Sequence, residues 1–275
     1  MKKSYPRNFI KFLGTAGARF VMISQMRSSA GTWITLGDDN LIIDPGPGTL
    51  VRAAKSRPPL DLRKLDAVIL THKHLDHSGD LNVTVEAMTQ GGWKKHGIVM
   101  APSDAIDGDD PILSGYLKTF PEKIITMKQG GEYILENLKI TTPIRLHHGV
   151  ETYGLNIYNT LEDKYPLISL VSDTRSFPGL LDHFPGRLLI LNTVLLDEIP
   201  GRDIEHLNFM ELAGMLEGKK YDLVVLTHFG MNMLRARPWK LAEQLSNETG
   251  LKVTAASDGM LLDLDSFDKN IWKRK

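Results

Sequence analysis

The chain has 275 residues, of which 42% are hydrophobic and 24% are charged, and it contains no cysteine. These are ordinary globular values, so a substantial core can be buried. The missing thiols exclude disulfides, thiolate metal ligands, iron–sulfur clusters and cysteine nucleophiles. The 33 basic residues balance the 33 acidic ones, which gives no general attraction toward nucleic acid.

The N-terminal residues carry positive charge but no long apolar stretch behind it, because Lys11 and Arg19 interrupt the sequence that follows. We therefore expect no signal peptide. Nowhere do about eighteen apolar residues run together, so we expect no transmembrane helix. These observations predict a soluble, cytoplasmic protein without a membrane partner.

In the first half of the chain, short apolar runs bounded by Gly, Pro, Asn and Asp predict strands. We interpret Gly14-Thr15-Ala16-Gly17 as a plain turn, because it lacks the Lys-Ser/Thr of a P-loop. The segment 18–31 is predicted to be a loop. The expected strands are 9–13, 33–36, 41–43, 65–70, 98–101, 124–127, 133–135 and 138–142; the expected helices are 50–55, 80–90 with Asp80 as N-cap, and part of 104–118.

The second half repeats this alternation of strands and helices. Its expected strands are 154–158, 167–171, 188–191, 223–226, 252–255 and 260–264; its expected helices are 208–216 and 239–245. No linker or low-complexity segment separates the halves. This pattern indicates a layered α/β structure with two sheets, which we interpret as a single domain over residues 1–275.

Three histidines and an aspartate stand close together after the apolar run 67–70, in Thr71-His72-Lys73-His74-Leu75-Asp76-His77. The end of a strand can point positions 72 and 74 the same way, and a tight turn brings 76 and 77 to a neighbouring point. Four such groups would be buried and unpaired unless a cation held them. The run predicts a metal site.

Further metal-capable residues follow apolar runs elsewhere in the chain. They are Asp44, His147-His148, Asp173, His206 and His228. If each run is a strand, these residues gather at one rim of the sheets, where binding sites are usually built.

The motifs, in this order, resemble those of the metallo-β-lactamase fold superfamily. That family has an aspartate at a strand end, a His-x-His-x-Asp-His run, a later histidine, a bridging aspartate and a final histidine. The resemblance implies a four-layer αββα sandwich. It also implies one metal held by His72, His74 and His148, and another held by Asp76, His77 and His228, with Asp173 bridging the two.

Neutral imidazoles and carboxylates without thiolates suit two divalent ions, of which Zn²⁺ is favoured while Mn²⁺ and Fe²⁺ stay open. Asp44 is expected behind the metal ligands, where it would orient a ligand histidine or the turn beneath it.

Within the superfamily, the chain looks most similar to ribonuclease Z and related phosphodiesterases. Four motifs show this similarity: Phe12-Leu13-Gly14-Thr15, the Tyr153-Gly154 pair after His148, Leu226-Thr227-His228-Phe229 and Asp258-Gly259-Met260. The spacing to the Tyr-Gly pair selects His148 over His147. His206-Leu207-Asn208 resembles the His-Ser-Thr segment whose histidine is the general acid, although a histidine that caps the following helix is the competing interpretation.

Two departures argue against a tRNA-processing enzyme. Only residues 159–166 stand where that branch has a long tRNA-gripping arm, and the final motif reads His-Phe-Gly instead of His-Phe-Ser. We therefore expect a small phosphodiester or nucleotide as the substrate, not a long nucleic acid. The alternatives are hydrolysis of a lactone, thioester or amide, a tRNA 3′-end endoribonuclease without the arm, and an inactive metal-bound interaction protein.

The expected mechanism uses a metal-bound hydroxide as nucleophile. Asp76 would orient it or take its proton, and His206 would protonate the leaving group. Arg175 is predicted either to contact a phosphate oxygen or to make an ordinary surface salt bridge. The sequence leaves the oligomeric state open, with a homodimer as one option.

Overall fold

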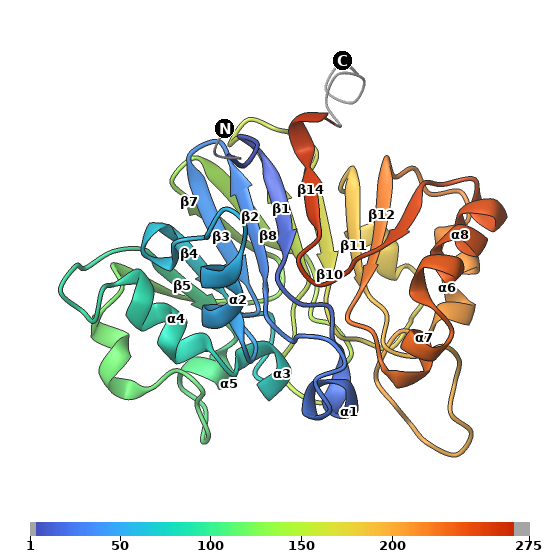
Figure 1. Cartoon of the computed structure of the whole chain (residues 1–275), viewed down its shortest axis with the longest axis horizontal. Coiled ribbons are helices and arrows are strands. Elements are labelled where there is room, and N and C mark those ends of the chain that lie inside the picture. The colour runs from blue at the N-terminus through green and yellow to red at the C-terminus, as the bar shows by residue number, and fades with distance from the viewer. Residues whose placement is uncertain (1–3, 267–275) are drawn as a thin grey trace. The chain divides into compact units, whose positions relative to one another are not determined.

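The computed structural model describes residues 4–266, and its strands form two seven-stranded sheets (Figure 1). The chain divides into two compact units. Unit 1 consists of residues 1–14, 28–126 and 257–275, and unit 2 consists of residues 15–27 and 127–256. Each sheet belongs to one unit.

The sheet of unit 1 has the order β14-β1-β2-β3-β4-β5-β6. Its β14, β1, β2 and β3 pair antiparallel, whereas β3, β4, β5 and β6 pair parallel. The strands are β1 (Phe9–Phe12), β2 (Thr32–Leu36), β3 (Asp39–Ile43), β4 (Ala67–Ile69), β5 (Ile98–Ala101), β6 (Lys123–Thr126) and β14 (Leu261–Asp263). The parallel half aligns the carboxyl ends of β3 and β4, where Asp44 and His72 follow.

Alternate residues of these strands pack against helices of the same unit. Trp33, Ile42 and Val68 join Val85 and Met88 in one buried cluster. The helices are α2 (Thr49–Lys55), η1 (Leu62–Lys64), α3 (Leu75–Ser78), α4 (Leu81–Met88), α5 (Ser103–Ile106) and η2 (Gly115–Thr119). In the parallel half, residues on the other sheet face, such as Ile43 and Ile69, are apolar and buried as well, as is usual for strands in parallel sheets.

The sheet of unit 2 has the order β13-β12-β11-β10-β9-β8-β7. Its strands β10 to β13 are parallel, whereas β7 to β10 pair antiparallel. The strands are β7 (Gly131–Leu135), β8 (Leu138–Thr142), β9 (Leu155–Tyr158), β10 (Ile168–Val171), β11 (Leu188–Asn192), β12 (Leu223–Thr227) and β13 (Val253–Ala255). The parallel strands are mostly Leu, Ile and Val, and they bring the segments after β10, β11 and β12 to one edge.

The helices of unit 2 complete its core. α6 and α8 pack on each other and α8 also lies along β13 (Figure 1), and Leu212, Leu241 and Leu245 join one buried cluster with Val224 and Leu226. The helices are α1 (Ala18–Ile23), η3 (Leu180–His183), α6 (Phe209–Leu216), α7 (Met231–Arg235) and α8 (Pro238–Thr249).

The structure corrects several predicted elements. The segment predicted as a loop contains α1, whose Phe20 and Ile23 side chains are 73% and 72% exposed. Because its apolar residues do not all face the core, the sequence shows no one-sided apolar pattern that would predict a helix. α7 was not predicted, and α8 continues to Thr249, where Gly250 at φ 71° ends it. Asp80 is the N-cap of α4, but its side chain accepts from Leu50 N–H (3.1 Å) and not from its own helix.

Within residues 4–266, no helix has the length and apolar character needed to cross a membrane. The single domain, the cytoplasmic location and the homodimer stay predictions.

Candidate metal centre

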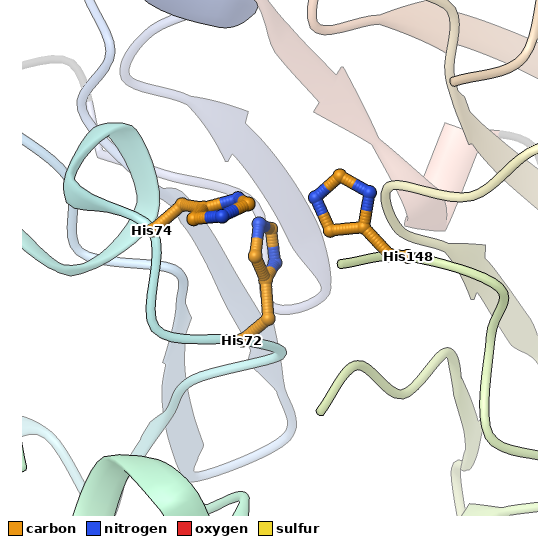
Figure 2. Close-up of side chains that lie close together, drawn as sticks. All are labelled: His72, His74 and His148. Carbon is orange, nitrogen blue, oxygen red and sulfur yellow. The ribbon is translucent and has the colours of Figure 1, made fainter. Parts of the chain in front are cut away.

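The histidine-rich run continues directly from β4, one of the buried parallel strands of unit 1. After Ile69, Leu70 N–H still donates to Met100 O (2.8 Å), and the chain then turns into α3 with His74 as its N-cap residue. The rings of His72 and His74 lie side by side, with centroids 4.9 Å apart (Figure 2), and those of His72 and His77 are 4.0 Å apart. The strand end and the short helix thus gather the donors of unit 1, as the sequence predicted.

Asp44 holds this run from behind. Its carboxylate accepts from Thr71 N–H (2.6 Å), from the Thr71 hydroxyl (2.8 Å) and from His77 Nδ1 (2.9 Å). Asp44 therefore orients both a histidine and the turn beneath it, as expected. Its φ of 52° lies in the left-handed region, which a non-glycine residue adopts at a cost, although aspartate does so more readily than most residues.

These hydrogen bonds fix which ring nitrogens carry protons. Because a carboxylate accepts at His77 Nδ1, that nitrogen carries the hydrogen, and the lone pair is on Nε2, which lies 3.6 Å from Asp76 Oδ2. The Thr71 hydroxyl gives its proton to Asp44 and lies 3.1 Å from His72 Nδ1, so it accepts from that nitrogen and the His72 lone pair is also on Nε2. In the neutral form, both histidines would therefore present Nε2 to a metal.

A glycine lets the Asp44 loop lie against α3. A Cβ built on Gly46 would come 2.0 Å from Asp76 O and 2.2 Å from Ser29 O. Asp80 N–H donates to Pro45 O (2.8 Å) and closes the same contact. Any larger residue at position 46 would push the loop away from the backbone that carries Asp76.

In unit 2, Asp173 follows β10 and is 2% exposed. Its Oδ1 accepts from Asn192 Nδ2 (2.9 Å), at the end of the neighbouring β11, and lies 3.3 Å from His228 Nδ1, which follows β12. Its Oδ2 lies 3.5 Å from His206 Nδ1. Adjacent parallel strands therefore deliver Asn192, Asp173 and His228 to one point.

His148 lies on the segment between β8 and β9 (Figure 2), and its Nδ1 lies 2.9 Å from Glu205 O. A carbonyl only accepts, so Nδ1 carries the hydrogen and the lone pair is on Nε2. One donor atom each from His148, Asp173 and His206 lie within 4.8 Å of one another. The neighbouring His147 instead packs on the Phe177 ring, with centroids 4.3 Å apart.

His206 does not follow a strand, contrary to the sequence interpretation. It lies in the segment between β11 and α6, where its N–H donates to Ile204 O (2.9 Å). The alternative role as a helix cap is wrong, because Asn208 caps α6 by accepting from Glu211 N–H (3.1 Å). His206 instead faces Asp173.

His228 sits on a strained backbone with a φ of 61°. The next residue, Phe229, is tied to the segment that leads into α1, because Phe229 N–H donates to Thr15 O (2.9 Å) and Gly17 N–H donates to Phe229 O (3.0 Å). A Cβ on Gly17 would lie 2.2 Å from His228 O, so this glycine allows the close approach.

Arg175 makes salt bridges instead of facing open solvent as a lone cation. Its guanidinium lies 3.0 Å from Asp203 and 2.8 Å from Glu205, and these two carboxylates raise its pKa. In the Tyr153-Gly154 pair, the Tyr153 hydroxyl donates to Glu151 (2.7 Å). Burial is the main cause that raises the pKa of Tyr153, and the hydrogen bond to the Glu151 carboxylate is the second.

Two residues that hold the donors, Asn192 and Thr71, had no predicted role. Asn192 ends an apolar strand and could have been found by that signal, as Asp173 was; Thr71 stands in the predicted run but was given no role. The donor atoms fit a divalent ion such as zinc, because the buried rings of His72 and His77 have Nδ1 engaged and the Asp76 carboxylate lies beside His77 Nε2.

The profile of the β-lactamase superfamily domain matches residues 39–229, and the chain belongs to this family. It is 29% identical over 263 residues to an uncharacterised protein of Methanocaldococcus jannaschii, and the aligned region covers 93% of this chain and 94% of that protein. It is 30% identical over 151 residues to ribonuclease Z of Methanopyrus kandleri, covering 54% of this chain and 49% of that enzyme.

Among solved structures, the metallo-β-lactamase fold protein YhfI from Bacillus subtilis is similar with a TM-score of 0.73 and 20% identity, over 93% of this chain and 98% of that one. The predicted metallo-β-lactamase fold, with mixed sheets flanked by helices, is confirmed. The chain is thus a member of a metallo-hydrolase superfamily.

Proposed function

We propose that this protein is a phosphodiesterase that acts on a nucleotide-type or other small phosphodiester with the help of two divalent ions. The observation that carries the proposal is His206 beside Asp173. The seven other candidate residues are enough to bind two ions, so His206 is not needed as a metal ligand and is available for another role. An alkoxide leaving group needs a proton donor, and a histidine is the usual one.

The ligands would be divided as the family resemblance implies. His72, His74 and His148 would hold one ion; Asp76, His77 and His228 would hold the other; Asp173 would bridge them. Zinc is favoured, with manganese and iron(II) as alternatives, because the donors are imidazoles and carboxylates. When bound, the ions would supply an activated water and a clamp for the two non-bridging phosphate oxygens.

The protein's own groups would do the rest. Asp76, next to His77 Nε2 at 3.6 Å, would orient the attacking water or take its proton. Asp173, near His206 Nδ1, would orient the His206 ring, and His206 would protonate the leaving oxygen. The partial identity with ribonuclease Z, an enzyme named for cleaving RNA, supports phosphodiester chemistry over the carboxylic alternative.

A short connection supports a small substrate over tRNA. β9 ends at Tyr158 and β10 begins at Ile168, so no long arm is inserted at the position where the resemblance would place one. Arg175, the other candidate for phosphate contact, already pairs with Asp203 and Glu205, which supports the salt-bridge interpretation of this residue.

The test is a metal analysis combined with a substrate screen. Purified protein, stripped with a chelator and reloaded with Zn²⁺ or Mn²⁺, should bind about two ions per chain and hydrolyse bis(p-nitrophenyl) phosphate. The same sample should leave lactone, thioester and lactam substrates intact. Hydrolysis of a carboxylic substrate without phosphodiesterase activity would overturn the proposal in favour of the carboxylic alternative.

A further inference from the structure

A cavity of about 540 Å³ lies in unit 2 beside a candidate metal ligand. It is lined by Gln129, Arg145, Leu146, His147, His148, Arg175 and Glu205. His148 belongs both to this wall and to the group with Asp173 and His206. A substrate that lies beside the candidate metal-binding residue His148 can therefore extend into the cavity.

The wall is polar and holds two arginines, of which only Arg175 makes a salt bridge among the described residues. Arg175 is neutralised by Asp203 and Glu205 at 3.0 and 2.8 Å. Arg145 is exposed, and among the described residues it makes no ion pair. The Gln129 amide and the His147 ring, which stand in the same wall, are further hydrogen-bonding groups.

The wall is held in place before any ligand arrives. Arg145 pairs antiparallel with Tyr153, and Leu146 N–H donates to Thr152 O (2.8 Å). His147 N–H donates to the Thr174 hydroxyl (3.0 Å), and Arg175 N–H donates to His147 O (3.0 Å). Because the backbone on both sides of Arg145 is engaged, a ligand would not have to order this segment on binding.

We infer that this cavity binds a second phosphate group of the substrate, with Arg145 as its main contact. A guanidinium recognises phosphate oxygens by two parallel charge-assisted hydrogen bonds, and the Gln129 amide can add a neutral one. The inference rests on the proposed function, because it places the second phosphate on the same molecule whose phosphodiester is cleaved. The substrate class becomes a phosphodiester that carries a further phosphate, such as a phosphorylated nucleotide.

Two substrates with the same reacting group separate this inference from the proposed function. Thymidine 5′-(p-nitrophenyl phosphate) has only the phosphodiester, whereas its 3′-phosphorylated derivative adds the second phosphate. The wild type should show a kcat/KM about tenfold to a hundredfold higher for the derivative, since a charge-assisted hydrogen bond has that magnitude. Arg145→Ala should abolish this preference without changing kcat/KM for the simpler ester, and Arg145→Lys should retain part of it.

Arg63→Ala is the matched control, because it removes the same charge from an exposed arginine that pairs locally with Asp61; it should keep the full preference. A readout without metal is calorimetric binding of thymidine 3′,5′-bisphosphate to the chelator-treated protein, which should weaken by a similar factor in Arg145→Ala alone. Equal kcat/KM for both esters, or a preference and binding that survive Arg145→Ala, would overturn the inference while leaving the phosphodiesterase proposal intact. If neither ester is cleaved, the proposed function fails, and the binding measurement by itself decides the phosphate site.

Discussion

The candidate donors of unit 1 come from one short segment, which runs from the end of β4 into α3, whereas those of unit 2 come from four separate segments. In unit 1 the six positions from His72 to His77 hold four donors, and a single carboxylate, Asp44, fixes the turn. In unit 2 the donors His148, Asp173, His206 and His228 come from separate segments. They are assembled by the ends of parallel strands and by small local contacts, such as Asn192 to Asp173.

The difference separates a locally encoded half of the candidate centre from a half that depends on tertiary structure. A change in the segment of unit 1 should affect several donors at once, because they share one support. A change behind one donor of unit 2 should affect fewer donors, because these stand on four separate segments, although Asp173 contacts both His206 and His228. The following predictions test this contrast.

Removal of a ligand should have the largest effect in either unit. His74→Ala and His148→Ala should each lose metal and reduce kcat/KM on bis(p-nitrophenyl) phosphate by more than about a thousandfold, beyond the 10–100-fold typical of residues behind the ligands. Elemental analysis and initial rates measure this. His183→Ala, at an exposed histidine of η3, is the control. Full metal content and activity in His74→Ala would remove the whole assignment.

His206→Ala should separate acid catalysis from metal binding. On a diester with an alkyl leaving group, kcat should fall by about 10²–10⁴, the usual contribution of a general acid. On bis(p-nitrophenyl) phosphate the loss should be small, because nitrophenolate leaves without a proton. Metal content should stay at the wild-type level. An equal loss on both substrates would refute the acid role and indicate a positioning role for His206.

Asp44→Ala should be more harmful than Asn192→Ala. The first removes the acceptor shared by Thr71 and His77, and we expect a 10–100-fold loss of metal affinity. The second removes one hydrogen bond to Asp173, and we expect a smaller loss. Competition titrations with a chromophoric chelator measure both. Equal losses would contradict the contrast between a shared and a separate support.

Gly46→Ala should have the smallest effect on chemistry but a clear effect on stability. The added Cβ would overlap the Asp76 carbonyl, and relief of such crowding costs about 1–3 kcal/mol in the free energy of unfolding. Gly115→Ala, where a Cβ meets nothing within 4 Å, is the control and should be close to neutral. Denaturant unfolding of both variants measures this free energy. If Gly46→Ala unfolds with the same free energy as the wild type, the loop can move away from the added Cβ at no cost.

The sequence alone determined the strands, the order of the metal motifs and the family, because these depend on local patterns. A buried apolar strand followed by His-x-His-x-Asp-His needs only neighbouring residues to be recognised. The role of Asp44 behind the ligands could be expected too, because the family resemblance places an aspartate after a strand at this point of the motif order.

Tertiary structure alone decided which of the isolated histidines stand near Asp173, and how. His206 follows no strand and its role depends on a contact across 33 positions of chain (206 − 173), which no local pattern records. The salt bridges of Arg175 likewise depend on partners distant in the sequence, and the position of Arg145 and His148 in the wall of one cavity is visible only in the folded chain. Local propensity specifies strands and turns, whereas burial and pairing of charged groups arise only when the parallel strands have been laid side by side.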